Sequence, residues 1–319
     1  MPIPLILDVD TGIDDTFALM LAARHPEVDL RAVTCVAGNA PVDKVLANTL
    51  YVLDAAGAGE VPVARGAARP LLAPPRHAEH VHGADGLGGF SRPSDRRAST
   101  LHAVALLRRE LLAAVATGER ITLVPLAPLT NIALLLRAHP EVAAGLERIV
   151  FMGGSAGPGN ATAVAEFNVW HDPEAAAMVL AACGELDIPV TMYGLDVFGA
   201  VTVDGDDAAR LREQPDPAAQ LAGNLIDAQR ALLDAQAVTI GDAGAVCAVI
   251  DPAGLSTTRF PVRVDVGAGY ARGQTIVDRR EWSGDRAADP HEGPVTAVDV
   301  ALAVDAARYA ALWLRSFDI

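Results

Sequence analysis

The sequence predicts an α/β fold in which a single domain carries a mostly parallel central sheet flanked by helices. Short continuous apolar runs alternate with longer helical stretches, which is the pattern of βαβ units. No linker, repeat or shift in composition divides the chain, so residues 1–319 are expected to form one domain. Hydrophobic residues make up 51% of the chain, enough for a sizeable core. No apolar run reaches the roughly 20 residues that a membrane-spanning helix needs.

The apolar runs predict six buried strands with helices between them. Strands of a parallel sheet are covered on both faces, so they read as continuous apolar runs. Their carboxyl ends lie at one edge of the sheet, where α/β proteins bind ligands. The expected strands are Ile3–Leu7, Leu30–Val36, Val61–Ala64, Ile121–Pro125, Ile149–Met152 and Ile188–Met192, and the expected helices are Thr16–Ala23, Val42–Ala56, Leu101–Ala116, Leu129–Arg137 and Glu174–Ala182.

Two stretches interrupt this alternation. Residues 69–97 are rich in Pro, Gly, His and charge and are too long for an ordinary connection, so we expect an active-site flap there. Residues 203–242 are expected to be mainly helical. The remaining expected elements are helices at Ala218–Ala237, Ala245–Ile250 and Asp305–Phe317, and a hairpin of edge strands at Phe260–Val266 and Gln274–Val277.

Composition excludes several classes of function. The formal charge is −15, which argues against binding to a nucleic acid polymer, since phosphate backbones require clustered Lys and Arg. Cys35, Cys183 and Cys247 are widely spaced in apolar stretches, so we expect buried, inert thiols instead of disulfides or a thiolate metal site. The first four residues lack the basic flank of a signal peptide, which predicts a cytoplasmic protein.

An acidic motif follows the first predicted strand. The segment Asp8-Val9-Asp10-Thr11-Gly12-Ile13-Asp14-Asp15 places four carboxylates within eight residues at the start of a helix. One or two of them can cap the helix, where Asp is favoured. Four carboxylates repel one another unless a cation lies among them, and oxygen ligands suit Ca²⁺ or Mg²⁺. The motif therefore predicts a site for a hard cation.

The acidic motif closely resembles the signature of the inosine-uridine nucleoside hydrolase family, and further motifs in the family's order extend the resemblance over almost the whole chain. The resemblance implies a Rossmann-like nucleoside hydrolase architecture and hydrolysis of the N-glycosidic bond of a ribonucleoside to free base and ribose. The matching segments are Val36–Asn39, Val81–Gly83 with Gly86–Leu87, Pro125–Leu126 with Pro128–Asn131, Met152–Gly154, Gly159–Asn160 with Ala165–Asn168, Asp172–Ala175, Asp242 and Gly273–Asp278.

The resemblance also implies a calcium site and a catalytic base. Asp10, Asp15, the main-chain carbonyl of Leu126 and Asp242 would hold Ca²⁺. Asp10 would take a proton from a calcium-bound water that attacks the anomeric carbon. The family's role in nucleoside catabolism and in purine or pyrimidine salvage is expected to carry over. Its members are usually homo-oligomers, which implies a homodimer or homotetramer.

The ribose contacts follow from the same resemblance. Asp14, Asn39 and Asn168 would bind the 2′- and 3′-hydroxyls, and Asn160 and Glu166 the 5′-hydroxyl; Asp242 is also expected on the ribose. Carboxylates around the sugar suit a transition state that resembles a ribosyl cation. Taken singly, Asn39 and Asn160 have a structural alternative, because asparagine is suited to turns. Glu166 and Asn168 flank Phe167 in strand-like alternation, so both can point at one site.

The chain departs from the family at the leaving group. Well-known members have a histidine before the calcium-binding aspartate, and here that position is Gly241. His82, expected to contact the base, or another flap residue can protonate the base instead. Alternatively, an aromatic residue such as Trp170 or Trp282 stacks on it, or an unusual nucleoside leaves without protonation. The helix before Asp242 offers Leu225, Gln229 and Arg230, of which Gln229 is our base-binding candidate.

Two other functions fit part of the sequence. A calcium- and ribose-binding relative could have lost catalysis together with the histidine, although retention of Asp10 argues against it. The segment from Asp8 to Thr11 also resembles the nucleophile motif of haloacid-dehalogenase-like phosphatases. Those enzymes need a downstream lysine, and Lys44 comes too early in the chain.

Overall fold

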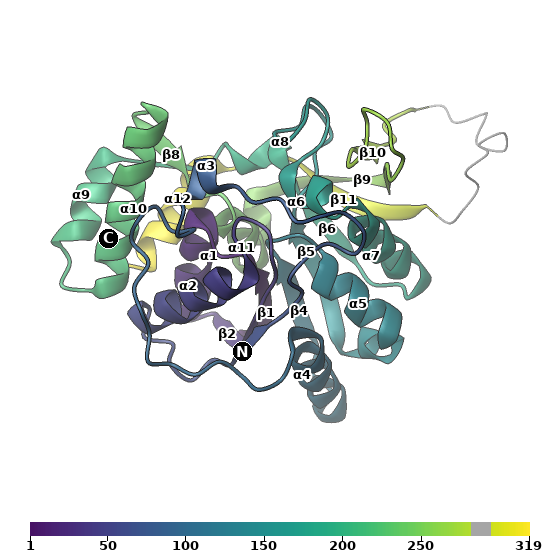
Figure 1. Cartoon of the computed structure of the whole chain (residues 1–319), viewed down its shortest axis with the longest axis horizontal. Coiled ribbons are helices and arrows are strands. Elements are labelled where there is room, and N and C mark those ends of the chain that lie inside the picture. The colour runs from purple at the N-terminus through teal and green to yellow at the C-terminus, as the bar shows by residue number, and fades with distance from the viewer. Residues whose placement is uncertain (282–294) are drawn as a thin grey trace.

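The computed structural model describes residues 1–281 and 295–319, whose strands form one large sheet and one small sheet (Figure 1). Within these residues the large sheet has nine strands in the order β10-β9-β11-β6-β5-β4-β1-β2-β3. Its strands are β1 (Ile3–Val9), β2 (Val28–Cys35), β3 (Val63–Arg65), β4 (Ile121–Pro125), β5 (Leu146–Met152), β6 (Val190–Tyr193), β9 (Leu255–Val264), β10 (Thr275–Val277) and β11 (Thr296–Val304). The predicted mostly parallel sheet is confirmed, because β1 to β6 pair in parallel and β11 joins β6 in parallel.

Helices cover both faces of the large sheet. One face packs against α1, α2, α10, α11 and α12, and the other packs against α4, α5 and α7, each through its own apolar core. The sheet is therefore the middle of three layers. The α-helices are α1 (Ile13–Arg24), α2 (Val42–Ala55), α3 (Glu79–His82), α4 (Ala103–Thr117), α5 (Thr130–Ala138), α6 (Phe167–His171), α7 (Pro173–Glu185), α8 (Leu195–Phe198), α9 (Gly205–Glu213), α10 (Pro217–Leu233), α11 (Ala243–Ile250) and α12 (Ala306–Arg315).

The strand order reverses beside β1. The chain proceeds from β1 to β2 and β3 on one side, then returns to lay β4, β5 and β6 on the other side. Such a switch point opens a crevice at the carboxyl ends of the two central strands. The acidic motif follows β1 and Leu126 follows β4, so the topology brings these two segments to the crevice.

The six predicted strands and five predicted helices are all present, with ends that shift by a few residues. The C-terminal part differs more. β9 lies between β10 and β11, so only β10 is an edge strand of the predicted hairpin. β11 was not predicted, and neither was the small antiparallel sheet of β7 (Thr202–Asp204) and β8 (Ala237–Thr239), which brackets α9 and α10.

Further expectations concern the flap and the thiols. In residues 69–97 the only helix is α3, and the rest is loop. This loop packs against α1 through His82, which accepts a hydrogen bond from Ile13, and against α2 through Lys44 and Asn48, which donate to the carbonyls of Ala84 and Asp85. The three cysteines are buried and free, as predicted. In the described part of the chain no helix combines the length and the apolarity needed to cross a bilayer.

Candidate active site

The first turn of α1 organises the acidic motif. Asp15 accepts hydrogen bonds from the backbone N–H of Gly12 at 2.8 Å and of Asp10 at 3.2 Å. These bonds close the strand-to-helix turn, and the free N–H groups of the helix N-terminus favour negative charge there. One carboxylate of the motif is thus used for capping, which leaves the others to be explained.

Asp10 is buried next to the end of β2. Its Oδ2 accepts a 2.6 Å hydrogen bond from the backbone N–H of Asn39, and its Oδ1 has no hydrogen-bond partner among the described residues. The side chain of Asn39 in turn lies 3.4 Å from Oδ2 of Asp15. A buried carboxylate oxygen without a partner is costly in a folded protein and points to a ligand.

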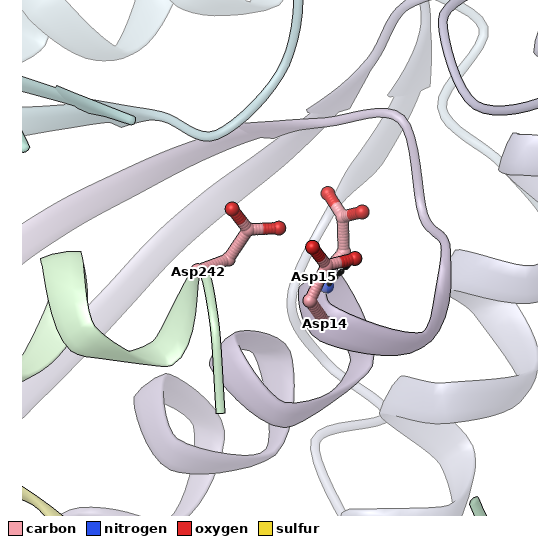
Figure 2. Close-up of side chains that lie close together, drawn as sticks. All are labelled: Asp14, Asp15 and Asp242. Atoms are coloured by element: carbon pink, nitrogen blue, oxygen red, sulfur yellow. Dashed lines mark hydrogen bonds between the residues drawn. The ribbon is translucent and has the colours of Figure 1, made fainter. Parts of the chain in front are cut away.

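A second aspartate segment completes the acidic cluster. Asp242, at the N-terminus of α11, faces the first turn of α1, and ligand oxygens of Asp14, Asp15 and Asp242 lie within 4.8 Å of one another (Figure 2). Burial, and then repulsion from Asp14, raises the pKa of Asp15 to about 8. Burial and the neighbouring aspartates also raise the pKa values of Asp10 and Asp242 well above the ordinary value. These carboxylates fit a hard cation, because a cation would relieve the repulsion that burial intensifies.

Asp8 lies outside this cluster. It is fully buried, and its Oδ1 accepts hydrogen bonds from Thr34 and, at 2.8 Å, from Nδ2 of Asn131. Burial raises its pKa to about 7. Thr34 and Asn131 thus hold Oδ1 of Asp8, whereas its Oδ2 has no hydrogen-bond partner among the described residues. Asp8 is not one of the expected cation ligands.

The far wall of the site comes from the segment after β5. The carboxylate of Glu166 accepts hydrogen bonds from the backbone N–H groups of Gly154, Asn168 and Val169 at 2.8 to 3.1 Å, and it caps α6. Burial raises the pKa of Glu166 to about 7. Nδ2 of Asn168 donates to the carbonyl of Leu126 at 2.9 Å. The strand-like alternation expected around Phe167 is wrong: a helix begins there, and the cap directs Glu166 into the site.

Most of the predicted site residues line one cavity of about 440 Å³, whereas the buried Asp10 and Asp15 are not among its lining residues. Its sugar-sized end is formed by Asp14, Asn39, Glu166, Asn168 and Asp242, with Asn160 at the rim. Asn160 accepts a 2.9 Å hydrogen bond from the backbone N–H of Phe167, which fixes its side chain. The structure therefore brings all six predicted ribose residues to one cavity.

His82 from the flap is fixed against α1. Its Nδ1 accepts a hydrogen bond from the backbone N–H of Ile13 at 3.2 Å, so the neutral ring carries its proton on Nε2. Gly12 permits this approach, because a Cβ there would lie 2.5 Å from Nδ1 of His82. Burial lowers the pKa of His82, which favours the neutral ring. His82 lines the cavity, as does the exposed His80.

The other end of the cavity is formed mainly by residues that the sequence analysis did not single out. Gln229 lines it as predicted, whereas Leu225 is part of the core and Arg230 pairs with Asp227. Phe198 lies shortly after the carboxyl end of β6. The sequence could have indicated it as a site residue, because segments that follow parallel strands gather at the ligand-binding edge of the sheet. Besides His80, the unpredicted lining residues are Arg76, His77, Ala78, Val81, Met152, Ala161, Phe167, Phe198, Leu233, Val238 and Thr239.

Of the two tryptophans expected to stack on the base, one lies at the cavity. Trp170 lines the cavity, and the guanidinium of Arg76 lies 4.3 Å from the centroid of a Trp170 ring. Trp282 lies outside the described residues. His171 does not line the cavity; its buried ring packs against Phe167.

Gly241 has no room for a side chain. It adopts φ +52°, and a Cβ would lie 2.7 Å from Cβ of Asp14 and 2.9 Å from Cζ of Phe198. The ring of Phe198 thus occupies the space next to Asp242 that a longer residue at 241 would enter. The cavity wall is apolar at this point.

Comparisons with known proteins agree with this arrangement. A family model described as "Inosine-uridine preferring nucleoside hydrolase" matches residues 5–311. The chain is 39% identical over 289 residues to the pyrimidine-specific ribonucleoside hydrolase RihA of Shewanella sp. (strain MR-7), with 88% of each chain covered. It is 38% identical over 285 residues to the inosine-uridine preferring nucleoside hydrolase of Leishmania major, with 88% of this chain and 89% of that one covered. Among solved structures, a plant nucleoside hydrolase, PpNRh1, superposes with a TM-score of 0.88 at 29% identity over 99% of both chains. A purine-preferring ribonucleoside hydrolase from Gardnerella vaginalis superposes with a TM-score of 0.86 at 29% identity over 98% of both chains.

Proposed function

The chain belongs to the inosine-uridine preferring nucleoside hydrolase family and is an N-glycosidase acting on ribonucleosides; we propose that Asp10 is its catalytic base and that its cofactor is Ca²⁺. The observation that carries the proposal is the unpartnered Oδ1 of Asp10, which is buried and repelled by Asp15 and Asp14. A carboxylate oxygen without a hydrogen-bond partner is available to accept a proton from water.

The proposed cation ligands are Asp10, Asp15, the carbonyl oxygen of Leu126 and Asp242. The donor set consists of oxygen atoms alone, which Ca²⁺ prefers. Leu126 presents its backbone oxygen because Nδ2 of Asn168 binds the same carbonyl and fixes its orientation. When bound, Ca²⁺ would polarise a water molecule and the ribose hydroxyls. Asp14 lies close enough to the cluster to contribute as well.

Asp10 performs the proton transfer in this proposal. Its Oδ1 accepts the proton of the water that attacks the anomeric carbon, while the hydrogen bond from Asn39 holds Oδ2 in place. The bond between the anomeric carbon and the base nitrogen breaks, and its electron pair leaves with the base. The surrounding carboxylates stabilise the positive charge that develops on the sugar.

The sugar is held by polar groups whose geometry the fold fixes. We assign the 2′- and 3′-hydroxyls to Asp14, Asn39 and Asn168, with Asp242 also near the ribose, and the 5′-hydroxyl to Asn160 and Glu166. Glu166 and Asn160 are each bound to backbone N–H groups, so they need no reorganisation when substrate arrives.

The leaving base meets His82, Gln229 and Trp170. Because no acid stands at Gly241, we propose that Nε2–H of neutral His82 donates a hydrogen bond to the departing base and stabilises the negative charge that develops on it. Gln229 supplies an amide to the base edge, and Trp170 supplies an aromatic face at the cavity. The relatives include a pyrimidine-specific and a purine-preferring enzyme, so both base classes belong in the assay.

Release of reducing sugar from purine, pyrimidine and modified nucleosides tests the proposal. We expect ribose release with Ca²⁺, loss of release with EDTA, and loss in Asp10→Ala even with Ca²⁺. Retained turnover in Asp10→Ala would contradict the assignment of the base. Turnover that survives EDTA would contradict the cation, and ribose binding without turnover would favour the non-catalytic alternative. The cytoplasmic location and the homodimer or homotetramer stay predictions, which cell fractionation and light scattering test.

A further inference from the structure

A second cavity of about 260 Å³ adjoins the base end of the active site. It lies between α3, the first turn of α1 and the C-terminal half of α10, and we call it the α3/α10 groove. The two cavities share His80, Val81 and Gln229, so these three side chains form the wall between them. The remaining lining residues are Ile13, Glu79, Gly83, Gly88, Ala228 and Leu232.

The groove is apolar apart from its rim. Two large apolar side chains at the groove are unusually exposed, Leu232 at 58% and Val81 at 38%. Exposed apolar groups gathered at a concave surface indicate a binding site for an apolar group. Glu79 places a carboxylate at the same groove, so an anionic occupant is disfavoured. The chemistry of the lining thus favours a neutral, apolar occupant.

Gln229 is not committed to the fold. Its side chain is 9% exposed, and Oε1 has no hydrogen-bond partner among the described residues. An unpaired amide in a buried wall is costly, so a ligand group at this wall would satisfy it. Because Gln229 faces both cavities, a ligand at the wall can contact the active site and the groove together.

The position of the sugar sets the direction of the base. The proposed base contacts His82 and Gln229 line the same cavity as the ribose residues, so a base that reaches them lies beside Gln229, one of the side chains shared with the groove. We propose that the α3/α10 groove receives an apolar substituent on the base edge remote from the glycosidic bond, an inference that rests on the proposed function. The substrates would then include ribonucleosides with bases that carry such a substituent.

Two matched pairs of nucleosides test this inference: adenosine with N6-benzyladenosine, and cytidine with N4-benzylcytidine. The quantity measured is the ratio of kcat/KM for the substituted nucleoside to kcat/KM for its parent, with Ca²⁺ present. Ala228→Phe fills the groove without entering the active-site cavity, because Ala228 lines the groove alone. Ala231→Phe is the matched control, since Ala231 is exposed on the same helix and lines neither cavity.

We expect the wild type to accept the substituted nucleoside with a ratio within about threefold of unity for any parent it hydrolyses. Ala228→Phe should lower that ratio at least tenfold, and Ala231→Phe should leave it within twofold. A wild-type ratio below one hundredth, or equal ratios in the two variants, would overturn the inference. Circular dichroism checks folding, and Ala228→Leu replaces Ala228→Phe if the larger side chain prevents folding.

If neither parent is hydrolysed, the wider nucleoside panel decides about the proposed function, and calorimetric binding of N6-benzyladenosine decides about the groove. Weaker binding in Ala228→Phe than in Ala231→Phe would support the groove independently of turnover. No binding, or equal binding in both variants, would overturn it.

Discussion

The backbone N–H of Asn39 donates a 2.6 Å hydrogen bond to Oδ2 of Asp10 and so joins the carboxyl ends of β2 and β1. This bond leaves Oδ1 as the oxygen of Asp10 without a partner among the described residues. The neighbouring Gly38 makes the contact possible, because a Cβ at residue 38 would lie 2.0 Å from Oδ2 of Asp10. The position of the proposed base therefore depends on a glycine in the adjacent strand-to-helix connection.

The first prediction concerns this glycine. Gly38→Ala must displace Asp10, and a shift of about 1 Å in a reacting group costs on the order of 10²-fold in rate. We expect kcat/KM for nucleoside hydrolysis to fall by about that factor in Gly38→Ala. Gly59→Ala is the control, because a Cβ at Gly59 meets nothing within 4 Å. Equal activity of the two variants would show that Asp10 tolerates the displacement.

The second prediction concerns the cation and is measured by thermal unfolding. A ligand that binds only the folded state at a hundred times its Kd stabilises it by about 2.7 kcal/mol, so Ca²⁺ should raise the Tm of the wild type by several degrees. Asp242→Asn should abolish this rise. Without Ca²⁺ its Tm should equal or exceed that of the wild type, because one charge leaves a buried repulsive cluster.

Glu213→Gln makes the same charge change on an exposed residue of α9 and should keep the full rise with Ca²⁺. A rise of the wild-type size in Asp242→Asn would place the cation elsewhere. No rise in the wild type would contradict the calcium proposal.

The sequence predicted the parallel sheet and the sugar end of the site because both depend on local patterns. Apolar runs identify buried strands, and polar residues directly after them, such as Asp10 and Asn39, must gather at one sheet edge. The hydrogen bond from Asn131 to Asp8 could not be predicted, because the two residues are 123 positions apart and no local pattern indicates that they meet. The contact between Phe198 and Gly241 could not be predicted for the same reason, since it depends on tertiary packing.

The third prediction separates proton donation from simple contact at His82. The bond from Ile13 to Nδ1 leaves Nε2–H as the donor, and burial keeps the pKa low, so the ring is neutral at pH 7. If Nε2–H assists the leaving base, His82→Gln should lower kcat/KM for nucleosides by about 10²-fold. The same variant should change hydrolysis of p-nitrophenyl riboside less than about fivefold, since that leaving group needs no proton.

Equal losses on both substrates would mean that His82 only positions the sugar. His139→Gln, remote from the cavity, should leave both substrates unaffected.

The fourth prediction concerns stability against acid. Burial, together with the nearby His77 and Arg76, lowers the pKa of His171 to about 4 in the folded protein, against 6.5 as its ordinary value. Between these values the unfolded chain binds a proton that the folded protein does not, so this contribution is complete above pH 6.5 and is lost as the pH falls toward 4. At pH 5 the loss amounts to about 2 kcal/mol.

His171→Leu removes this group. The free energy of unfolding of the variant minus that of the wild type, from urea unfolding in EDTA, should therefore increase by about 2 kcal/mol from pH 7.5 to pH 5. The packing change itself adds a term that does not depend on pH. A difference that is the same at both pH values would show that His171 titrates normally in the folded protein.

The last prediction tests whether the contact between Phe198 and Gly241 determines what can stand beside Asp242. Gly241→His should lower kcat/KM strongly, because its Cβ would meet Asp14 and Phe198 at less than 3 Å and displace a proposed ribose contact. Removing the ring in Phe198→Ala opens part of that space, so kcat/KM of the double variant Gly241→His/Phe198→Ala should be at least tenfold higher than that of Gly241→His alone.

Gly57→Ala supplies the backbone control, since Gly57 has φ +73° but a Cβ there meets nothing within 4 Å. The positive φ alone costs about 1 to 2 kcal/mol, so a small loss of stability without loss of activity is expected in this control. If the double variant is no more active than Gly241→His, the obstacle is Asp14 and not Phe198, because Phe198→Ala leaves the contact with Cβ of Asp14 unchanged.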